Sequence, residues 1–182
     1  MSFPMLKIPD ECPQEIEEVF GEFRRDMGFP ITPNFMKIQG HSRAAVTGTW
    51  GLLQGALLSG SLPRALKEML IAAVSHDRQC VYCEAAHLAC CRSLGIAPAT
   101  LQALVEHVEE LTPAKVRDII LFALKCARDP QGLTQQDHAS LRAHGLTDEE
   151  IMELISMTGL AVYLNIVADA TGVAPDDMFF QV

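Results

Sequence analysis

The sequence has few basic residues, and this shortage limits the partners that we expect. Its 182 residues include 14 Lys and Arg against 23 Asp and Glu, which gives a formal net charge of −9 at pH 7. Nucleic acids and anionic membranes attract proteins with the opposite balance of charge. We therefore expect neither a nucleic acid nor a membrane among the partners of this protein.

Three further patterns are missing. The N-terminal stretch MSFPMLKIPDECP has early prolines and acidic residues and no apolar h-region, so we expect no signal peptide and a cytoplasmic location. No segment alternates apolar and polar side chains in the way that predicts a half-buried β-strand. No low-complexity linker divides the chain, which is long enough to bury a core. We therefore expect one domain over residues 1–182.

What the sequence contains instead is a series of helix signals. Apolar residues recur at helical spacing, and capping residues or prolines mark where helices begin. These starts are expected near Ser42, at Ser61 and Pro63, at Thr112-Pro113, at Thr134, and at Thr147, which forms a capping box with Glu150. We predict an all-α domain of about eight helices, with N-terminal helices in residues 13–58, a cysteine-rich core in 61–95 and C-terminal helices in 98–170.

Two segments carry no charge. Residues 44–63 reach the length of a membrane span, but their glycines and polar side chains favour a buried helix, in which Gly51 and Gly55 let another backbone approach. Residues 154–168 are also uncharged, so we expect the last long helix to be buried within the subunit or between subunits. Apolar helices with few charges suggest shared interfaces, and we therefore expect a homo-oligomer.

Most of the cysteine lies in one short stretch. Four of the six cysteines fall within HDRQCVYCEAAHLACC, residues 76–91. In a chain expected to stay in a reducing compartment, such a cluster indicates a catalytic or metal-binding site and seldom a structural disulfide. On a helix, Cys80, Cys83, His87, Cys90 and Cys91 would lie on one face.

Cys80 and Cys83 form a C-x-x-C pair in the first turn of this expected helix. Unsatisfied backbone N–H groups and the helix dipole favour a thiolate at that place. His87 follows Cys83 by one turn, where it can accept the thiol proton. Glu68, in the preceding helix, is flanked by small residues that suit close packing, and it could orient His87. The sequence thus predicts a dithiol with an adjacent base.

Zinc binding and a purely structural role are the alternatives for this segment. Cys80, Cys83, His87 and either Cys90 or Cys91 would supply four zinc ligands on paper. One continuous helix, however, cannot easily surround a metal ion with its own side chains, so we expect no metal. Cys90 and Cys91 are more typical of small core residues than of redox partners.

Glu68, Cys80, Cys83 and His87 match the E-x11-C-x2-C-x3-H signature of the alkylhydroperoxidase-D (AhpD) family. In these residues the chain resembles the peroxidase-related branch of the all-helical carboxymuconolactone-decarboxylase-like superfamily. The resemblance is strongest over residues 62–94, and PNFMKIQGHSRAAVTG and residues 111–155 also look like this branch. It implies an AhpD-like helical bundle that assembles as a homo-oligomer, a trimer or a hexamer.

The resemblance also implies a role for each matching residue. Cys83 would be the peroxidatic thiolate, Cys80 would resolve its sulfenic acid as a Cys80–Cys83 disulfide, and His87 with Glu68 would relay protons. A hydroperoxide would be the substrate and a dithiol, lipoyl-type in the best-known members, the reductant. No haem, flavin or metal cofactor is implied. The thiol steps are ordinary thiolate chemistry.

One position departs from the family pattern. Some members carry a histidine next to the second cysteine that joins the proton relay, and this chain has Tyr82 there. A phenol forms hydrogen bonds but is a poor base near neutral pH, so Tyr82 is expected to be a secondary site residue. Two other functions therefore stay open beside the peroxidase: thiol–disulfide exchange or redox sensing with little peroxide turnover, and a non-catalytic helical oligomer with or without zinc.

Overall fold

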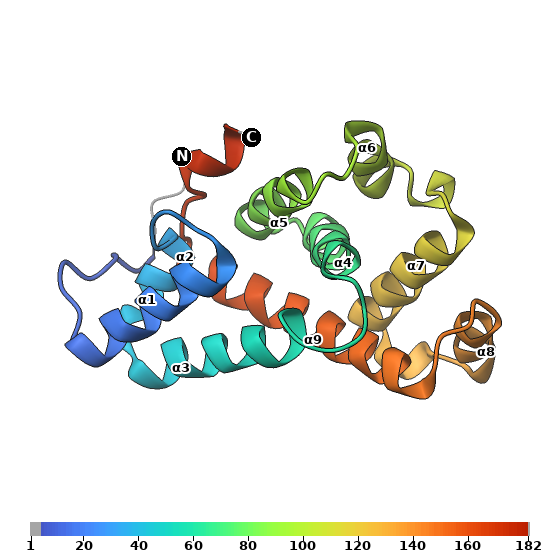
Figure 1. The fold of residues 1–182 in the computed structure, drawn as a ribbon, viewed down its shortest axis with the longest axis horizontal. Helices are drawn as coiled ribbons and strands as arrows, with labels where there is room; N and C mark the ends of the chain where they lie inside the picture. The colour runs from blue at the N-terminus through green and yellow to red at the C-terminus, as the bar shows by residue number, and fades with distance from the viewer. Residues whose placement is uncertain (1–4, 182) are drawn as a thin grey trace.

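Helices account for most of the part of the chain that the computed structural model describes, residues 5–181 (Figure 1). The first four residues of the stretch examined for a signal peptide lie outside this range. The α-helices of the described residues are α1 (Gln14–Met27), α2 (Asn34–Ile38), α3 (Arg43–Leu52), α4 (Arg64–Asp77), α5 (Val81–Ser93), α6 (Pro98–Glu106), α7 (Ala114–Arg128), α8 (Gln135–Ala143) and α9 (Asp148–Thr171). No strand occurs between residues 5 and 181. The all-α class is confirmed, with nine α-helices where about eight were expected.

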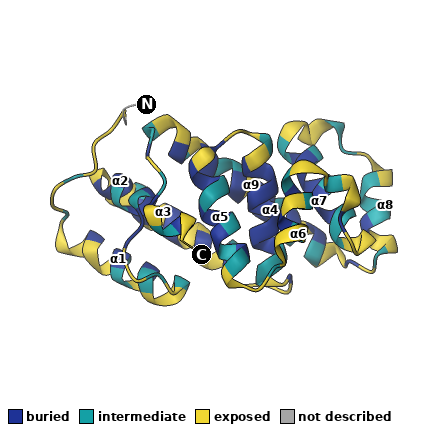
Figure 2. Ribbon diagram, turned by 90° about the horizontal axis from the view of Figure 1, so that it is seen from above, coloured by how far each residue is buried: buried dark blue, intermediate teal, exposed yellow. Residues whose placement is uncertain are grey.

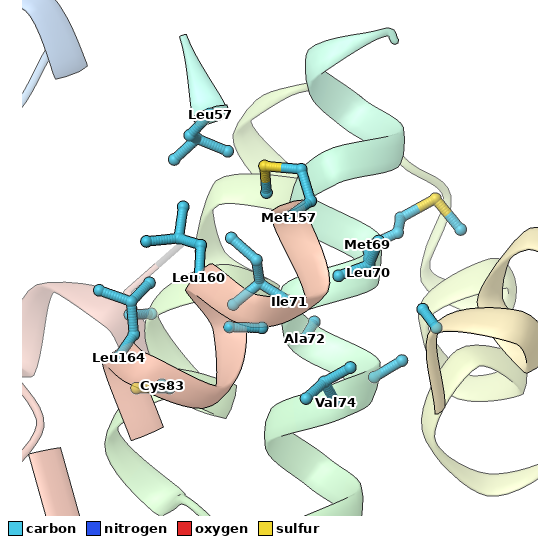
Figure 3. Close-up of a cluster of buried hydrophobic side chains, with 14 of the residues drawn as sticks. Leu57, Met69, Leu70, Ile71, Ala72, Val74, Cys83, Met157, Leu160 and Leu164 are labelled. Atoms are coloured by element: carbon cyan, nitrogen blue, oxygen red, sulfur yellow. The ribbon is translucent and has the colours of Figure 1, made fainter. Parts of the chain in front are cut away.

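Helix α4 forms the centre of the molecule. It packs against α5, α6, α7 and α9, and every residue from Lys67 to Ser75 is buried. Figure 2 shows that burial is concentrated in α4 and the middle of α9, while the outer helices expose one face each. The cluster in Figure 3 joins residues of α4 such as Leu70 and Ile71 to Met157 and Leu160 of α9. The single-domain organisation itself stays a prediction.

The helix caps follow the sequence signals at most positions. Thr134 and Thr147 each close a complete capping box, and the Ser42 side chain accepts a hydrogen bond from the backbone of Ala45. The helices expected at Thr112-Pro113 and at Ser61 and Pro63 begin at Ala114 and Arg64, directly after the two prolines. Pro113 and Pro63 take the N-cap positions there, because a proline has no N–H group to leave unsatisfied at a helix start.

The helix expected after Ser42 is present, but the prediction that residues 44–63 are buried is wrong for most of them. This segment forms α3 and a π-helical turn, η2 (Leu53–Leu57), that lie on the surface with one buried stripe. Val46, Trp50, Leu53 and Leu57 make that stripe at helical spacing. Both Gly51 and Gly55 face open space, with no atom near the place of an added Cβ. Small uncharged residues tolerate water, so the absence of charge did not require burial.

Helix α9 combines a buried face with exposed apolar side chains. Of the described residues, only this helix is long and apolar enough to cross a membrane, and half of its apolar window is buried inside the protein. A core helix of a soluble protein meets the same criteria, so the finding is weak evidence for a membrane. Met152 and Ile166 lie on the opposite, exposed side of the helix.

A buried lysine joins three segments of the fold. Lys67 of α4 is 1% exposed, and its ammonium donates to the carbonyl of Ala56 at 2.8 Å and to that of Ser59. It also pairs with Glu153 of α9, whose carboxylate accepts from the N–H of Ser61. The ammonium of Lys67 thus links the turn before α4 to α9 through hydrogen bonds and an ion pair.

We expect Lys67→Met to lower the free energy of unfolding by about 2–3 kcal/mol. The methionine fills the space but leaves the carbonyls and Glu153 without their charged donor. Urea denaturation measures the loss. Lys125→Met is the matched control, because Lys125 pairs with Asp137 at 2.7 Å on the surface. We expect this substitution to lower the free energy of unfolding much less. Equal losses in the two variants would contradict a special role for the buried ammonium.

Candidate active site

The turn between α4 and α5 places the two cysteines of the C-x-x-C pair. Gln79 has a positive φ of 60°, which lets the chain reverse after α4. Cys80 is then the N-cap of α5, and its N–H donates to the carbonyl of Ser75 at 2.9 Å. Cys83 occupies the third helical position, so both thiols lie at the positive end of the helix dipole. Both are free thiols and both are buried.

The acid and the base that the sequence singled out lie in contact. Glu68 of α4 is fully buried, and its Oε2 is 2.5 Å from Nδ1 of His87 on α5. Since Nδ1 faces this carboxylate, Nε2 is the ring nitrogen that remains for proton exchange near Cys83. The packing of α4 against α5 therefore brings together all four residues of the motif.

Arg64 completes this arrangement and was missed by the sequence analysis. Its Nε donates to Oε1 of Glu68 at 2.7 Å and its Nη2 lies 2.6 Å from the same oxygen. Each carboxylate oxygen thus has its own cationic partner, Arg64 on one side and His87 on the other. Arg64 stands four residues before Glu68, the spacing at which side chains of one helix meet, so the local signal was present.

The charges of this buried group stabilise one another. Burial alone would raise the pKa of Glu68, but His87 and then Arg64 outweigh it and hold that pKa below its ordinary value. Burial likewise acts to lower the pKa of His87, and the Glu68 carboxylate outweighs it, so the His87 pKa is raised. A carboxylate and an imidazolium are therefore the favoured forms.

The two thiols are made unequal by their contact. A hydrogen bond from Cys80 lowers the pKa of Cys83 against the opposing effect of burial, and His87 and a hydrogen bond from Asn165 lower it further. The same hydrogen bond to Cys83, together with burial, raises the pKa of Cys80 well above its ordinary value. Cys83 is thus the more acidic thiol of the pair and Cys80 the one that donates to it.

An apolar pocket opens onto Cys83 and His87. Its cavity volume is about 50 Å³, and its walls are almost entirely apolar. Phe23, Phe29 and Phe35 line it from the N-terminal third of the chain; Leu164 of α9 and Phe179 of the 3₁₀ turn η5 (Asp177–Phe180) line it from the C-terminal end. Such a lining suits an apolar organic group and offers few polar groups for a hydrophilic ligand.

Tyr82 directs its hydroxyl away from the dithiol. The phenol donates to Oδ2 of Asp176 at 2.7 Å and accepts from the N–H of Phe35 at 3.1 Å. Burial and the Asp176 carboxylate raise its pKa strongly, so it stays neutral. The ring still lines the pocket, while the hydroxyl holds α2 and the segment before η5 against α5.

We expect Tyr82→Phe to lower the free energy of unfolding by about 1–2 kcal/mol, because Asp176 and the Phe35 N–H each lose a buried partner. The pH dependence of Cys83 alkylation should stay as in the wild type. Urea denaturation and iodoacetamide labelling at a series of pH values provide the two measurements. A shifted labelling profile would instead show that the hydroxyl acts on the thiolate.

The other cysteines and histidines of residues 76–91 take no part in the contact between Glu68 and His87. Cys91 is buried in the core, and Cys90 is half-buried and lines the pocket next to His87. His76 pairs with Glu84 on the surface at 3.1 Å and does not line the pocket. Within residues 5–181, no group of three or more His, Cys, Asp or Glu side chains is arranged to hold a metal ion.

Comparison with known proteins finds a matching family model and a curated relative. The carboxymuconolactone decarboxylase family model matches residues 43–123. Over 72 residues, 40% of this chain, the sequence is 33% identical to an alkyl hydroperoxide reductase of Mycobacterium tuberculosis. The match spans about a fifth, 20%, of that curated relative.

Several solved structures have the same fold. An uncharacterized peroxidase-related protein from Ralstonia eutropha, described as an alkylhydroperoxidase AhpD core, is 25% identical, with 100% of this chain and 97% of that chain covered and a TM-score of 0.90. A peroxidase-related protein from Silicibacter is 27% identical, with 97% and 93% covered and a TM-score of 0.87. The debrominase Bmp8, solved with 2,3,4-tribromopyrrole, is 18% identical, with 100% and 96% covered and a TM-score of 0.82, which supports the fold alone.

Proposed function

We propose that the chain is a cofactor-free thiol peroxidase of the AhpD-like part of the carboxymuconolactone decarboxylase superfamily, a proposal that the family match and the peroxidase-related relatives support. Its substrates are hydroperoxides, reduced through a dithiol–disulfide cycle of Cys80 and Cys83 with Glu68 and His87 as proton relay. The observation that carries the proposal is the buried contact of Glu68 with His87 beside Cys83, whose thiol has a lowered pKa.

In the oxidation step, the Cys83 thiolate attacks the terminal oxygen of the hydroperoxide. The S–O bond forms as the O–O bond breaks, so sulfur is oxidised to a sulfenic acid and the peroxide is reduced. The departing alkoxide needs a proton, and the imidazolium of His87 supplies it, which releases an alcohol. Glu68 holds His87 in place and favours its charged form before the step.

In the resolving step, the Cys80 sulfur attacks the sulfur of Cys83. A disulfide forms, and the hydroxide of the sulfenic acid leaves as water with the proton of Cys80. Cys80 and Cys83 are adjacent on the first turn of α5, so the step needs no large movement of the backbone. A dithiol then reduces the disulfide: one of its protons returns to Cys80 and the other to His87, and the Cys83 thiolate is restored.

The partners and the location form part of the proposal. We infer a dithiol reductant of lipoyl type, a homo-oligomer (a trimer or a hexamer) and a cytoplasmic location, with neither nucleic acid nor membrane as a partner. The exposed Met152 and Ile166 on α9 support an interface between copies. The apolar pocket supports an organic hydroperoxide as substrate in preference to hydrogen peroxide.

The test is a thiol count with intact mass on reduced, metal-free protein before and after one equivalent of cumene hydroperoxide. We expect one pair of thiols to be lost as a Cys80–Cys83 disulfide, mapped by digestion, and to return on addition of dihydrolipoamide with repeated turnover. A disulfide without repeated turnover would favour thiol exchange or redox sensing. Thiols that stay reduced would contradict the peroxidase and make zinc content the next measurement.

A further inference from the structure

The C-terminal turn η5 supplies one wall of the pocket at Cys83. It packs against α5 (Figure 1), and its Phe179 ring is 2% exposed and lines the pocket. This ring lies edge-on to Tyr82, with 5.7 Å between the ring centroids, and edge-on to Phe29 at 6.4 Å. The next residue, Phe180, is 67% exposed and does not line the pocket. Two neighbouring phenylalanines of one turn thus differ in their access to Cys83.

Hydrogen bonds hold this wall in place on both sides. The Asp176 carboxylate, just before the turn, accepts from the Tyr82 hydroxyl at 2.7 Å and from the N–H of Asn34 on α2 at 3.0 Å. Within the turn, Nη2 of Arg92 on α5 donates to the carbonyl of Phe179 at 2.7 Å. Each of these bonds involves a charged group, which makes it stronger than a bond between neutral groups. The Phe179 ring is therefore a fixed part of the pocket.

The pocket is small for an organic ligand. Its volume is about 50 Å³, whereas an engineered apolar cavity that binds benzene has a volume of about 150 Å³. The space beside Cys83 thus suits a hydroperoxide with a compact alkyl group, and an aromatic ring must displace part of the wall. Replacing Phe179 with alanine removes a ring of the size of benzene from that wall.

We propose that Phe179 determines specificity by limiting the size of the organic group that reaches Cys83, so that compact alkyl hydroperoxides are the preferred substrates. This inference rests on the peroxidase function proposed above and names the class of its substrates. Cumene hydroperoxide also oxidises Cys83, but more slowly than a compact alkyl hydroperoxide, because its aromatic ring has to displace that of Phe179.

The first test compares two alkylating reagents, iodoacetamide and its N-phenyl derivative iodoacetanilide. Both attack the same thiolate, so a change in the pKa of Cys83 cancels from the ratio of their rates. Digestion and mass spectrometry read the labelling of Cys83 separately from that of Cys80. In Phe179→Ala we expect the ratio of the iodoacetanilide rate to the iodoacetamide rate at Cys83 to rise at least about tenfold. An unchanged ratio would overturn the proposal.

Phe180→Ala is the matched control, since it removes the same ring from the same turn but outside the pocket. Its ratio should equal that of the wild type. Equal rises in Phe179→Ala and Phe180→Ala would overturn the proposal, because they would show that a loosened turn and not the Phe179 ring controls access.

Cys91 reports unfolding in the same digest. It is 0% exposed and does not line the pocket, so a folded variant leaves it unlabelled by both reagents. If Phe179→Ala exposes Cys91, Phe179→Leu takes its place. Leucine keeps an apolar side chain in the wall, and the ratio should rise by less than tenfold. An unchanged ratio in that variant, with Cys91 protected, overturns the proposal.

The second test uses ethyl hydroperoxide and cumene hydroperoxide on the same proteins. Phe179→Ala should raise the rate constant for cumene hydroperoxide about tenfold relative to that for ethyl hydroperoxide. A raised alkylation ratio with an unchanged peroxide ratio would overturn the assigned substrate class. A wild type that reduces neither peroxide would contradict the peroxidase itself, whereas the alkylation ratio would still decide whether Phe179 limits access to Cys83.

Discussion

Cys83→Ser should lower the rate constant for cumene hydroperoxide reduction at pH 7 by at least about 10³-fold, because a serine hydroxyl stays protonated whereas the pKa of the Cys83 thiol is lowered, which favours the nucleophilic thiolate. Stopped-flow measurement of peroxide loss gives the rate. The Cys80–Cys83 disulfide cannot form without the Cys83 sulfur, and burial still acts to raise the pKa of the remaining Cys80 thiol.

Cys80→Ser is the informative partner of this variant. Its hydroxyl can still donate to the Cys83 sulfur, so the first oxidation should stay within about tenfold of the wild-type rate. The protein should then stop after one equivalent of peroxide, with a sulfenic acid on Cys83 that dimedone traps. Dimedone labelling at Cys80 in a Cys83→Ser protein would reverse the roles of the two cysteines.

Glu68→Gln should lower the free energy of unfolding by about 3–5 kcal/mol. The substitution keeps the shape but leaves Arg64 and His87 without the buried carboxylate that neutralises them. Urea denaturation at pH 7 measures the loss. The peroxidase rate should fall as well, because the unpaired imidazole loses its proton and no longer favours the Cys83 thiolate.

The chain contains a matched control for this variant. His76 and Glu84 form another His–Glu pair between α4 and α5, at 3.1 Å but on the surface. Glu84→Gln should therefore cost less than about 1 kcal/mol and leave the peroxidase rate unchanged. Similar losses in the two variants would mean that the buried pair contributes no more than an exposed one.

The pH dependence of the Glu68→Gln effect has a defined sign. The pKa of Glu68 is lowered from 4.5. Its contribution to the free energy of unfolding is therefore present above pH 4.5 and is lost as the pH falls through the folded-state pKa. The pKa of His87 is raised from 6.5, so its contribution is complete below that value and is lost as the pH rises through the folded-state pKa. The stability difference between wild type and variant should be largest between pH 4.5 and 6.5.

The sequence was sufficient for the parts of the site that depend on local spacing. Glu68 and His87 lie on adjacent helices joined by a short turn, and the spacing indicated that Glu68 could orient His87, whereas the contact itself comes from the packing of the two helices. Caps such as the Thr147 box were equally local. The surface position of α3 was not predictable from its lack of charge, because small polar residues are as compatible with water as with a helix interface.

The remainder of the site could not be predicted for a physical reason. Leu164, Asn165 and Phe179 reach Cys83 from more than 80 residues away in the sequence, through the packing of α9 and η5. No spacing rule connects them to the cysteine motif. A single amide side chain in an uncharged segment was the one visible signal, and Asn165 was read only as part of an apolar stretch.

The walls of the pocket also differ in when they are synthesised. The ribosome completes α4, α5 and the cysteine pair long before it adds Leu164, Asn165 and Phe179. Until α9 and η5 dock, Cys83 lacks the pocket walls that these two segments supply, and with them part of the burial that acts to raise its pKa. The pocket around Cys83 is therefore complete only once the later helices have been made and packed.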